Sequence, residues 1–306
     1  MRKKVSLLCC VCFLASVALA QTDMDAIMMN KSQFCNGFQY DYSSWDHYWE
    51  GKMERTNENL GTVTTQSVMY MGAYGITDKL NVLAGLPYVW TKASGGTLHS
   101  MKGVQDVSAF VKWIPFQKRL GGGTLTTFAI GGVSTRTNDY TIDFLPLSIG
   151  MGSTNFIGRA MVDYNYKRVT LTGSAAYVRR SNVKLDRTSY YDTQLHLTNE
   201  VQMPNAAQYQ LRAGYRGRYL IAEALVSNWT TLGGFDITRN NMPFPSNRIN
   251  ATSVGVHVKY TTPFHSNLSI LAGANKTLAG RNMGRASAFD AGVFYAFYFK
   301  KPTTKK

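Results

Sequence analysis

Apolar and polar residues alternate along most of the chain with a period of two, which predicts β-strands. The last segment is the clearest case, because Phe289, Val293 and Tyr295 share one face while Asp290 and Gly292 share the other. The alternation recurs in about twelve segments, 37–49, 61–76, 80–91, 103–115, 122–135, 151–166, 168–180, 206–216, 218–230, 251–263, 267–277 and 286–299. The chain is therefore expected to be all-β.

The connections between these segments are alternately very short and long. Turns at 77–79, 167–168 and 216–217 are tight, whereas the polar stretch 181–204 is long. Strands joined by tight turns run antiparallel, and a sheet that spans lipid must close because an open edge finds no partner there. The pattern favours a closed antiparallel transmembrane β-barrel, an up-and-down meander of about 12 strands, with both termini in the periplasm. A soluble β-sandwich would also alternate, so the decision depends on further features.

The N-terminus has the organisation of a secretory signal peptide. A basic stretch, Arg2–Lys4, precedes an apolar stretch, Val5–Val17, and the small residues that end at Ala20 suit cleavage before Gln21. We therefore assign residues 1–20 to a signal peptide, which implies export and favours the membrane barrel over the sandwich. Three of the four cysteines lie within it, so the exported chain has no intramolecular disulfide.

The formal net charge is +15, and loss of the three basic residues of the leader leaves about +12. A charge of this size often indicates nucleic-acid binding. Export argues against such a partner here, and we expect the charge to lie in turns, loops and the basic C-terminal tail 300–306.

Aromatic residues gather at both ends of the predicted strands. Those near the short turns are Tyr74, Trp113, Phe116, Tyr166, Tyr215, Tyr219 and Phe264, and those at the opposite ends are Tyr88, Trp90, Tyr177 and Trp229. Two such bands are typical of a barrel whose ends lie at the two membrane interfaces. The last strand ends in Phe299, like the C-terminal signal read by the barrel-assembly machinery, although the tail 300–306 departs from that signal. Expected partners are this machinery, outer-membrane lipid and lipopolysaccharide.

Residues 21–36 are expected to form an N-terminal periplasmic segment or plug ahead of a barrel of residues 37–299. The stretch 21–32 contains three methionines and is apolar enough to enter the lumen from the periplasmic side. A disordered linker between the leader and the barrel is the alternative interpretation.

Charged residues fall on the strand face that is expected to line the lumen. They are Asp41, Asp106, Lys112, Arg159, Asp163, Arg212, Glu223, His257, Lys259 and Asp290. Charges at membrane depth are tolerated where they are paired or hydrated. They line a solute path or form a structural network of salt bridges, and the sequence leaves both alternatives open.

Motifs for metal binding and catalysis are weak. His47 and Glu50 have H-x-x-E spacing without a second histidine, so we expect no metal and no cofactor. No G-x-S-x-G motif is present. Ser253 lies about 13 Å from His257 along one strand, and Ser269 on the next strand is another candidate partner. We expect no enzyme, and a membrane-embedded hydrolase is the least favoured alternative.

Three segments carry a family resemblance: Tyr74-Gly75-Ile76-Thr77-Asp78-Lys79-Leu80, Gly85-Leu86-Pro87-Tyr88-Val89 and Gly103-Val104-Gln105-Asp106-Val107. They resemble the outer-membrane barrels named for the MetA pathway of phenol degradation, which carry Y-G-[IL]-T-D-[KR]-L, L-P-Y and G-x-x-D patterns. The matching residues are Tyr74, Gly75, Thr77, Asp78, Leu80, Pro87, Tyr88, Gly103 and Asp106. Residues 24–32 and 44–50 resemble the version found in Bacteroidota. The resemblance implies no catalytic residues, and it implies passage of small solutes, hydrophobic or aromatic ones included.

Together these observations predict an outer-membrane channel or transporter for the passive passage of small solutes. A structural or docking barrel with a sealed lumen is the main alternative.

Overall fold

The computed structural model describes residues 21–237 and 242–299 of the chain. The expected signal peptide (1–20) and the basic tail (300–306) lie outside the described residues. Within them, no helix is long and apolar enough to cross a membrane.

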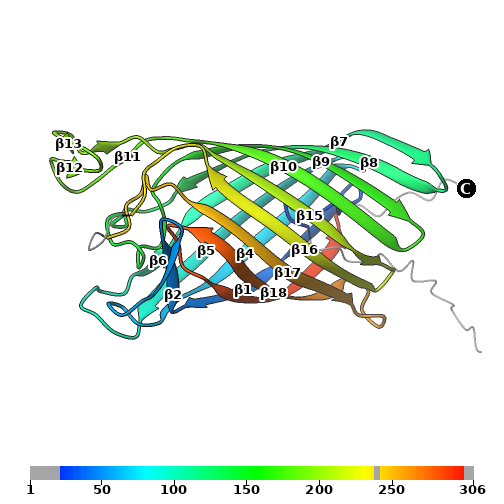
Figure 1. Ribbon diagram of the computed structural model, residues 1–306. Coiled ribbons are helices and arrows are strands. Elements are labelled where there is room, and N and C mark those ends of the chain that lie inside the picture. The colour runs from blue at the N-terminus through cyan, green and yellow to red at the C-terminus, as the bar shows by residue number, and fades with distance from the viewer. Residues whose placement is uncertain (1–20, 238–241, 300–306) are drawn as a thin grey trace, which may run out of the picture.

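Long antiparallel strands form one closed barrel (Figure 1). They are β1 (Gln33–Trp45), β4 (Val63–Thr77), β5 (Leu80–Ala93), β7 (Asp106–Leu120), β8 (Gly123–Arg136), β9 (Asn155–Tyr166), β10 (Val169–Arg180), β15 (Ala206–Arg216), β16 (Leu220–Thr231), β17 (Asn250–Thr261), β18 (Leu268–Arg281) and β19 (Ser287–Tyr298). Strands consecutive around the barrel are consecutive in this series, and β1 closes it by pairing with both β19 and β4. The predicted fold, a closed twelve-stranded meander, is confirmed.

The two faces of the wall differ as the alternation predicted. On β10, Leu171 and Tyr177 are exposed on the outside, whereas Thr170 and Thr172 are buried on the inside. On β19, Val293 is exposed and Phe294 is buried. The outer surface is therefore apolar along the strands, and the polar side chains face the lumen.

The connections at one end of the barrel are short and at the other end long, as Figure 1 shows. We call these ends the short-turn rim and the long-loop rim. At the short-turn rim the expected turn 117–121 is shorter than predicted, because β7 and β8 continue to Leu120 and from Gly123. Gly121 and Gly122 make the turn with φ of 56° and 79°, and only glycine adopts two such values without strain.

The first strand begins at Gln33, four residues earlier than expected, and ends at Trp45. Its early start has a packing reason: the ring of Phe34 lies 5.6 Å from that of Phe297 and 5.8 Å from that of Phe299. The residues expected to continue it form a separate hairpin, β2 (His47–Glu50) with β3 (Met53–Thr56). The barrel therefore starts at residue 33 rather than 37.

Short hairpins and loops cover the long-loop rim. Besides β2 and β3, the small strands are β6 (Lys102–Val104), β11 (Val183–Lys184), β12 (Tyr190–Tyr191), β13 (Leu195–His196) and β14 (Glu200–Val201). Within the long polar stretch 181–204, β12 and β13 pair as a hairpin of their own outside the barrel wall.

An ion pair joins two loops of the long-loop rim. The guanidinium of Arg281 donates to both oxygens of Asp236, over 2.6 and 2.7 Å, and Asn282 adds a third bond of 2.7 Å. The guanidinium, together with the Asn282 amide, holds the pKa of Asp236 at about 2. Asp236 therefore stays ionised across the physiological range.

Candidate functional site

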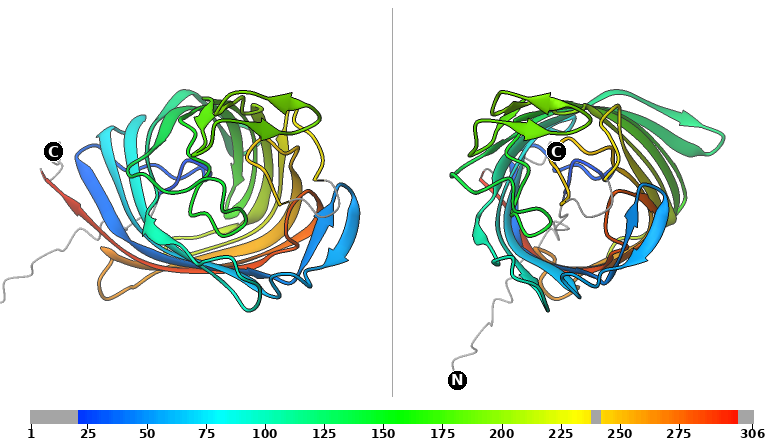
Figure 2. Two further views of the ribbon diagram at one scale, coloured as in Figure 1. Left: turned by 90° about the vertical axis from the view of Figure 1, so that its left-hand side faces the viewer. Right: turned by 60° about the vertical axis from the view of Figure 1, so that its left-hand side comes forward.

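Residues 21–32, for which the sequence left two alternatives, lie inside the barrel. Figure 2 shows this dark-blue segment crossing the interior of the ring of strands. It contacts strands all around the wall, from β5 through β7 and β9 to β15. We call residues 21–32 the plug.

The plug is anchored where it leaves the short-turn rim. Ser32 N donates to the carbonyl of Gly75 over 2.8 Å, and Lys31 N donates to Asp78 Oδ1 over 2.9 Å. A Cβ on Gly75 would lie 2.0 Å from the carbonyl oxygen of Asn30, so this position requires glycine. Two residues of the family-like turn, Gly75 and Asp78, therefore hold the base of the plug.

A carboxylate organises the inner half of the plug. Asp25 Oδ2 accepts from Thr22 N over 2.6 Å and from Thr22 Oγ1 over 2.8 Å, and Oδ1 accepts from Ile27 N over 2.9 Å. These bonds satisfy backbone donors that the barrel wall does not reach. The same carboxylate then meets the wall, so the shape of the plug and its attachment depend on one residue.

Four polar side chains of the wall receive the plug along one row of the sheet. Asn81, Lys112, Arg159 and Gln208, which we call the docking row, are connected through strand register by way of Ile130 and Ala176. Because register neighbours lie side by side in a sheet, the row runs straight across six strands.

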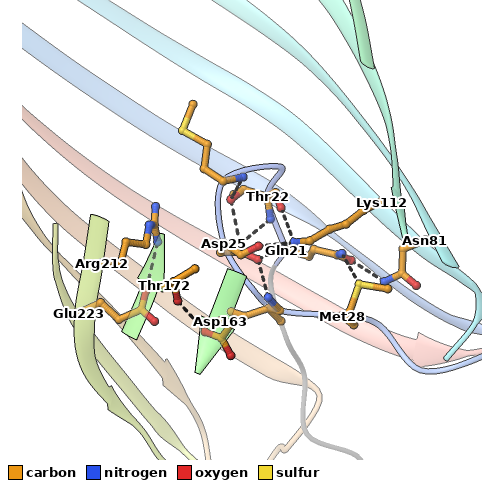
Figure 3. Close-up of polar contacts among 12 residues, drawn as sticks. Gln21, Thr22, Asp25, Met28, Asn81, Lys112, Asp163, Thr172, Arg212 and Glu223 are labelled. Atoms are coloured by element: carbon orange, nitrogen blue, oxygen red, sulfur yellow. Dashed lines mark hydrogen bonds and ion pairs between the residues drawn. The ribbon is translucent and has the colours of Figure 1, made fainter. Parts of the chain in front are cut away.

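Lys112 makes the densest contact of the row (Figure 3). Its Nζ donates to the carbonyl of Thr22 over 2.9 Å, to the carbonyl of Asp25, and to Asp25 Oδ1 over 3.1 Å. Lys112 is 0% exposed. The three bonds satisfy all three ammonium donors, so the plug fully replaces the water that Lys112 would otherwise bind.

The other members of the row contact the plug more lightly. Arg159 Nη2 lies 3.3 Å from Asp23 Oδ2 and also donates to Gln208 Oε1 over 2.8 Å. The side-chain amides of Asn81 and Gln21 meet at 2.8 Å, as Figure 3 shows. Polar contacts thus continue along the whole row.

Apolar side chains of the plug reach two adjoining parts of the wall. Met29 is 0% exposed and packs with Cys35, Ala73, Leu83, Leu271, Phe294 and Ala296 of β1, β4, β5, β18 and β19. Ala26 and Met28 pack with Ile114, Phe128, Ile130 and Met161 of β7, β8 and β9. Through these side chains the plug contacts eight consecutive strands of the wall, from β18 through β1 to β9.

A second group of predicted lumen residues forms a network within the wall. Arg216 donates to Glu223 Oε1 over 2.7 Å and to Asp163 Oδ1 over 3.2 Å, and Arg212 donates to Glu223 Oε2 over 3.2 Å. The hydroxyl groups of Thr170 and Thr172 also donate hydrogen bonds to Asp163 Oδ1. This part of the lumen has the structural salt-bridge network that the sequence left as an alternative.

The remaining candidates have separate positions. Asp106, near the long-loop rim, accepts from Tyr140 Oη over 2.7 Å. Lys259 is 2% exposed, and its Nζ has no hydrogen-bond partner in the part of the chain that the structure describes. His257 Nε2 lies 3.8 Å from Asp290 Oδ2, its neighbour but one across the wall.

The serines considered for a hydrolase are not arranged with His257. Ser253 Oγ donates to Thr277 over 3.3 Å, and Ser269 bonds with Thr261 over 2.9 Å. Ser269 lies four residues along β18 from Gly273, the register neighbour of His257. A separation of four residues is about 13 Å, so the serine–histidine pair of that alternative is not formed.

His47 and Glu50 likewise have other partners. His47 Nδ1 lies 2.8 Å from Asp46 Oδ1, and Glu50 binds Arg55 over 2.6 Å. Within residues 21–237 and 242–299, no three His, Cys, Asp or Glu side chains are placed to hold a metal ion.

Two cavities border the plug. The larger, about 460 Å³, is lined by Gln21–Met24 and by wall residues that include Asp41, Gln208, His257 and Asp290. The smaller, about 20 Å³, lies between Asp25, Lys259 and the wall network and has room for about one water-sized group.

Four polar residues of the plug and the docking row are not among the lumen residues predicted from the sequence: Asp23, Asp25, Asn81 and Gln208. Two acids within five residues of a segment judged apolar were the available signal for the first pair. The two amides occupy lumen positions of alternating strands, but an uncharged side chain gave no reason to single them out.

No family model and no curated protein matches the chain. Among solved structures it is similar to the COG4313 outer membrane channel from Pseudomonas putida F1, with a TM-score of 0.72 and 13% identity over 91% of this chain and 100% of that chain. The translocator domain of autotransporter NalP from Neisseria meningitidis gives a TM-score of 0.48 and 11% identity over 88% and 90%. The NanC porin gives a TM-score of 0.45 and 9% identity over 86% of this chain and 98% of that chain. The first likeness shows a shared barrel fold, and the phenol-degradation family is not confirmed.

Proposed function

We propose that this chain is an outer-membrane channel through which small solutes pass without an energy source, and that the plug closes it. The observation that carries the proposal is the polar seat of the plug. A permanent seal is made best by apolar packing, because buried ion pairs contribute little net stability once their desolvation is counted. Here Asp23 binds Arg159 and Asp25 binds Lys112. Water molecules or a solute can replace these carboxylates as hydrogen-bond partners of the two cations.

The proposed location is the bacterial outer membrane, with both termini in the periplasm. It is supported by the apolar outer face of the strands and by their even number. In this orientation the short-turn rim is periplasmic and the plug enters from that side. Lipid and lipopolysaccharide then surround the wall, and β19, followed by Phe299, supplies the signal for barrel assembly.

The proposed solutes are small, hydrophobic or aromatic molecules included. The family resemblance suggests this class, and the larger cavity supports it, because Met69, Met71, Phe110 and Leu225 line one part of it. Polar residues line the rest, so a molecule with an apolar body and a polar group fits both parts.

The alternative is a structural or docking barrel with a sealed lumen. It is favoured by the complete burial of Met29, a residue of the plug, and of Lys112, the wall residue that binds the plug. The two functions differ in one measurable respect, since a sealed barrel conducts no ions even when the plug is loosened.

Single-channel recording in planar bilayers tests the proposal. The full chain with Asp23→Asn and Asp25→Asn should open more often and for longer than the wild type, because the plug loses both of its charges. Asp139→Asn is the matched control, since Asp139 is 92% exposed and pairs only with Arg136 at the surface. Absence of conductance in the double variant, with a folded barrel on a gel, would leave the sealed barrel as the better account.

A further inference from the structure

The charges that face the plug are unbalanced within the wall itself. Among residues 21–237 and 242–299, Lys112 and Arg159 have ion-pair partners only in the plug, and Lys259 Nζ has no hydrogen-bond partner. By contrast, Arg212 and Arg216 are neutralised by acids of the wall network. Without the plug, three buried cations would therefore face the lumen without a wall carboxylate to pair with.

These three cations surround one place. Lys112 binds Asp25 from β7, and Lys259 of β17 lines the small cavity that Asp25 also lines. Arg159 lies in the docking row with Lys112 and binds Asp23, two residues away in the plug. The plug thus presents two carboxylates to a cationic seat that comes from three separate strands.

The carboxylates of the wall do not neutralise the three cations of this seat. Asp41 and Asp290 line the larger cavity but not the smaller one. Asp41 already accepts bonds from Gln39 over 2.7 Å and Ser67 over 3.0 Å, and Asp290 faces His257. Glu223 and Asp163 belong to the arginine network.

We infer that Asp23 and Asp25 stand in for the acidic groups of the solute, and that the channel takes small organic anions with two acidic groups. This inference rests on the proposed function and adds the chemical class of the solute. Such an anion competes with the plug for Lys112, Arg159 and Lys259. Opening is then coupled to the presence of the solute, because a ligand that binds only the unplugged state shifts the population toward it.

The thiol of Cys35 is a native reporter of this competition. Cys35 is 2% exposed and packs in the same cluster as Met29, so it becomes accessible to a small maleimide when the plug leaves. It is the one cysteine in residues 21–306. The rate of labelling of folded wild-type protein in detergent therefore follows the unplugged fraction, and no variant is needed for the first measurement.

The probe is succinate, compared at equal ionic strength with 1,4-diaminobutane, which has the same chain length and the opposite charge. At ten times its Kd for the unplugged state, succinate should raise the rate of Cys35 labelling about tenfold. The diamine should not raise it. Equal rates with succinate, with the diamine and with chloride would overturn the inference.

A pair of lysine variants locates the effect. Lys259→Gln should reduce the acceleration by succinate, because the seat loses one cation. Lys276→Gln is the matched control, since Lys276 lies on the outer face of β18, and it should respond like the wild type. A response to succinate that is identical in both variants would also contradict the inference.

Labelling and conductance separate the two proposals. A barrel that conducts but whose plug ignores succinate overturns the anion class alone. A barrel that never conducts, yet releases its plug to succinate, retains the anion site and overturns its role in passage.

Discussion

Replacement of Lys112 by methionine should release the plug while leaving the barrel folded. Methionine keeps most of the aliphatic length of the side chain, but it removes the ammonium group, whose Nζ lies 5.6 Å from the centre of the Phe128 ring. Asp25 would then remain buried without a hydrogen-bonded cation, because the other hydrogen bonds to its carboxylate come from within the plug. The wall itself loses only a side chain that makes no ion pair with another strand, so the barrel should keep its stability.

The magnitude follows from the burial of both partners. The side chains of Lys112 and Asp25 are 0% and 8% exposed, so this is a buried pair. Removing one member of a buried pair costs about 3–5 kcal/mol. Since each 1.4 kcal/mol is a factor of ten, the unplugged fraction should rise by about two to three and a half orders of magnitude until it saturates.

The assay is again the rate at which a small maleimide labels Cys35, with heat-dependent gel migration as the check of folding. The matched control is Lys276→Met, which changes a lysine on the outer face. A rate for Lys112→Met within about threefold of the wild type would refute the reasoning, because it would mean that the ion pair contributes less than about 1 kcal/mol to closure. A double change with Asp25→Asn should release the plug less than the single change, since it neutralises the buried carboxylate that Lys112→Met leaves without its cation.

Two further predictions concern the barrel and its outer loops. Gly132→Ala should lower the unfolding temperature of the barrel, because a Cβ there would lie 2.0 Å from the ring of Phe110, and overpacking costs about 1–3 kcal/mol. Gly131→Ala, with nothing within 4 Å of its Cβ, should be tolerated in the same gel-shift melting experiment. The pKa of Asp236 is held at about 2 by Arg281. Stability from a lowered carboxyl pKa is present above the ordinary value of about 3.9 and is lost as pH falls toward the folded value. Hydrogen-exchange protection of the long-loop rim should therefore be constant from about pH 7 to pH 4, and Asp236→Asn should lower it throughout that range.

The strands were predictable because each is recorded locally in the sequence. Alternation depends only on neighbours two positions apart. Leu171 could therefore be assigned to the outer face and Thr172 to the inner face without knowledge of any other strand. The start of β1 was misplaced because Cys35 and Asn36 invert the alternation, and Phe34 finds its aromatic partners at the far end of the chain. Such a contact depends on closure of the barrel.

The site was predictable in kind but not in its pairing. Lys112 and Arg159 could be assigned to the lumen from the sequence. Their partners could not be assigned, because the register across six strands decides which side chains lie in one row. The plug supplies the partners, and its carboxylates lie 87 and 136 residues away in the chain. No local pattern carries information over that range.

The plug is part of the same chain as the wall, and this has a kinetic consequence. It is tied to the short-turn rim at Ser32 and is followed at once by β1, so its return to the docking row is a first-order process. A tethered group of this kind acts at an effective concentration in the millimolar range for a short flexible link. A free solute that competes for the same seat must reach a similar level, or bind correspondingly more tightly. Such a channel has a threshold: it opens at high solute concentration and shuts by itself as the supply falls.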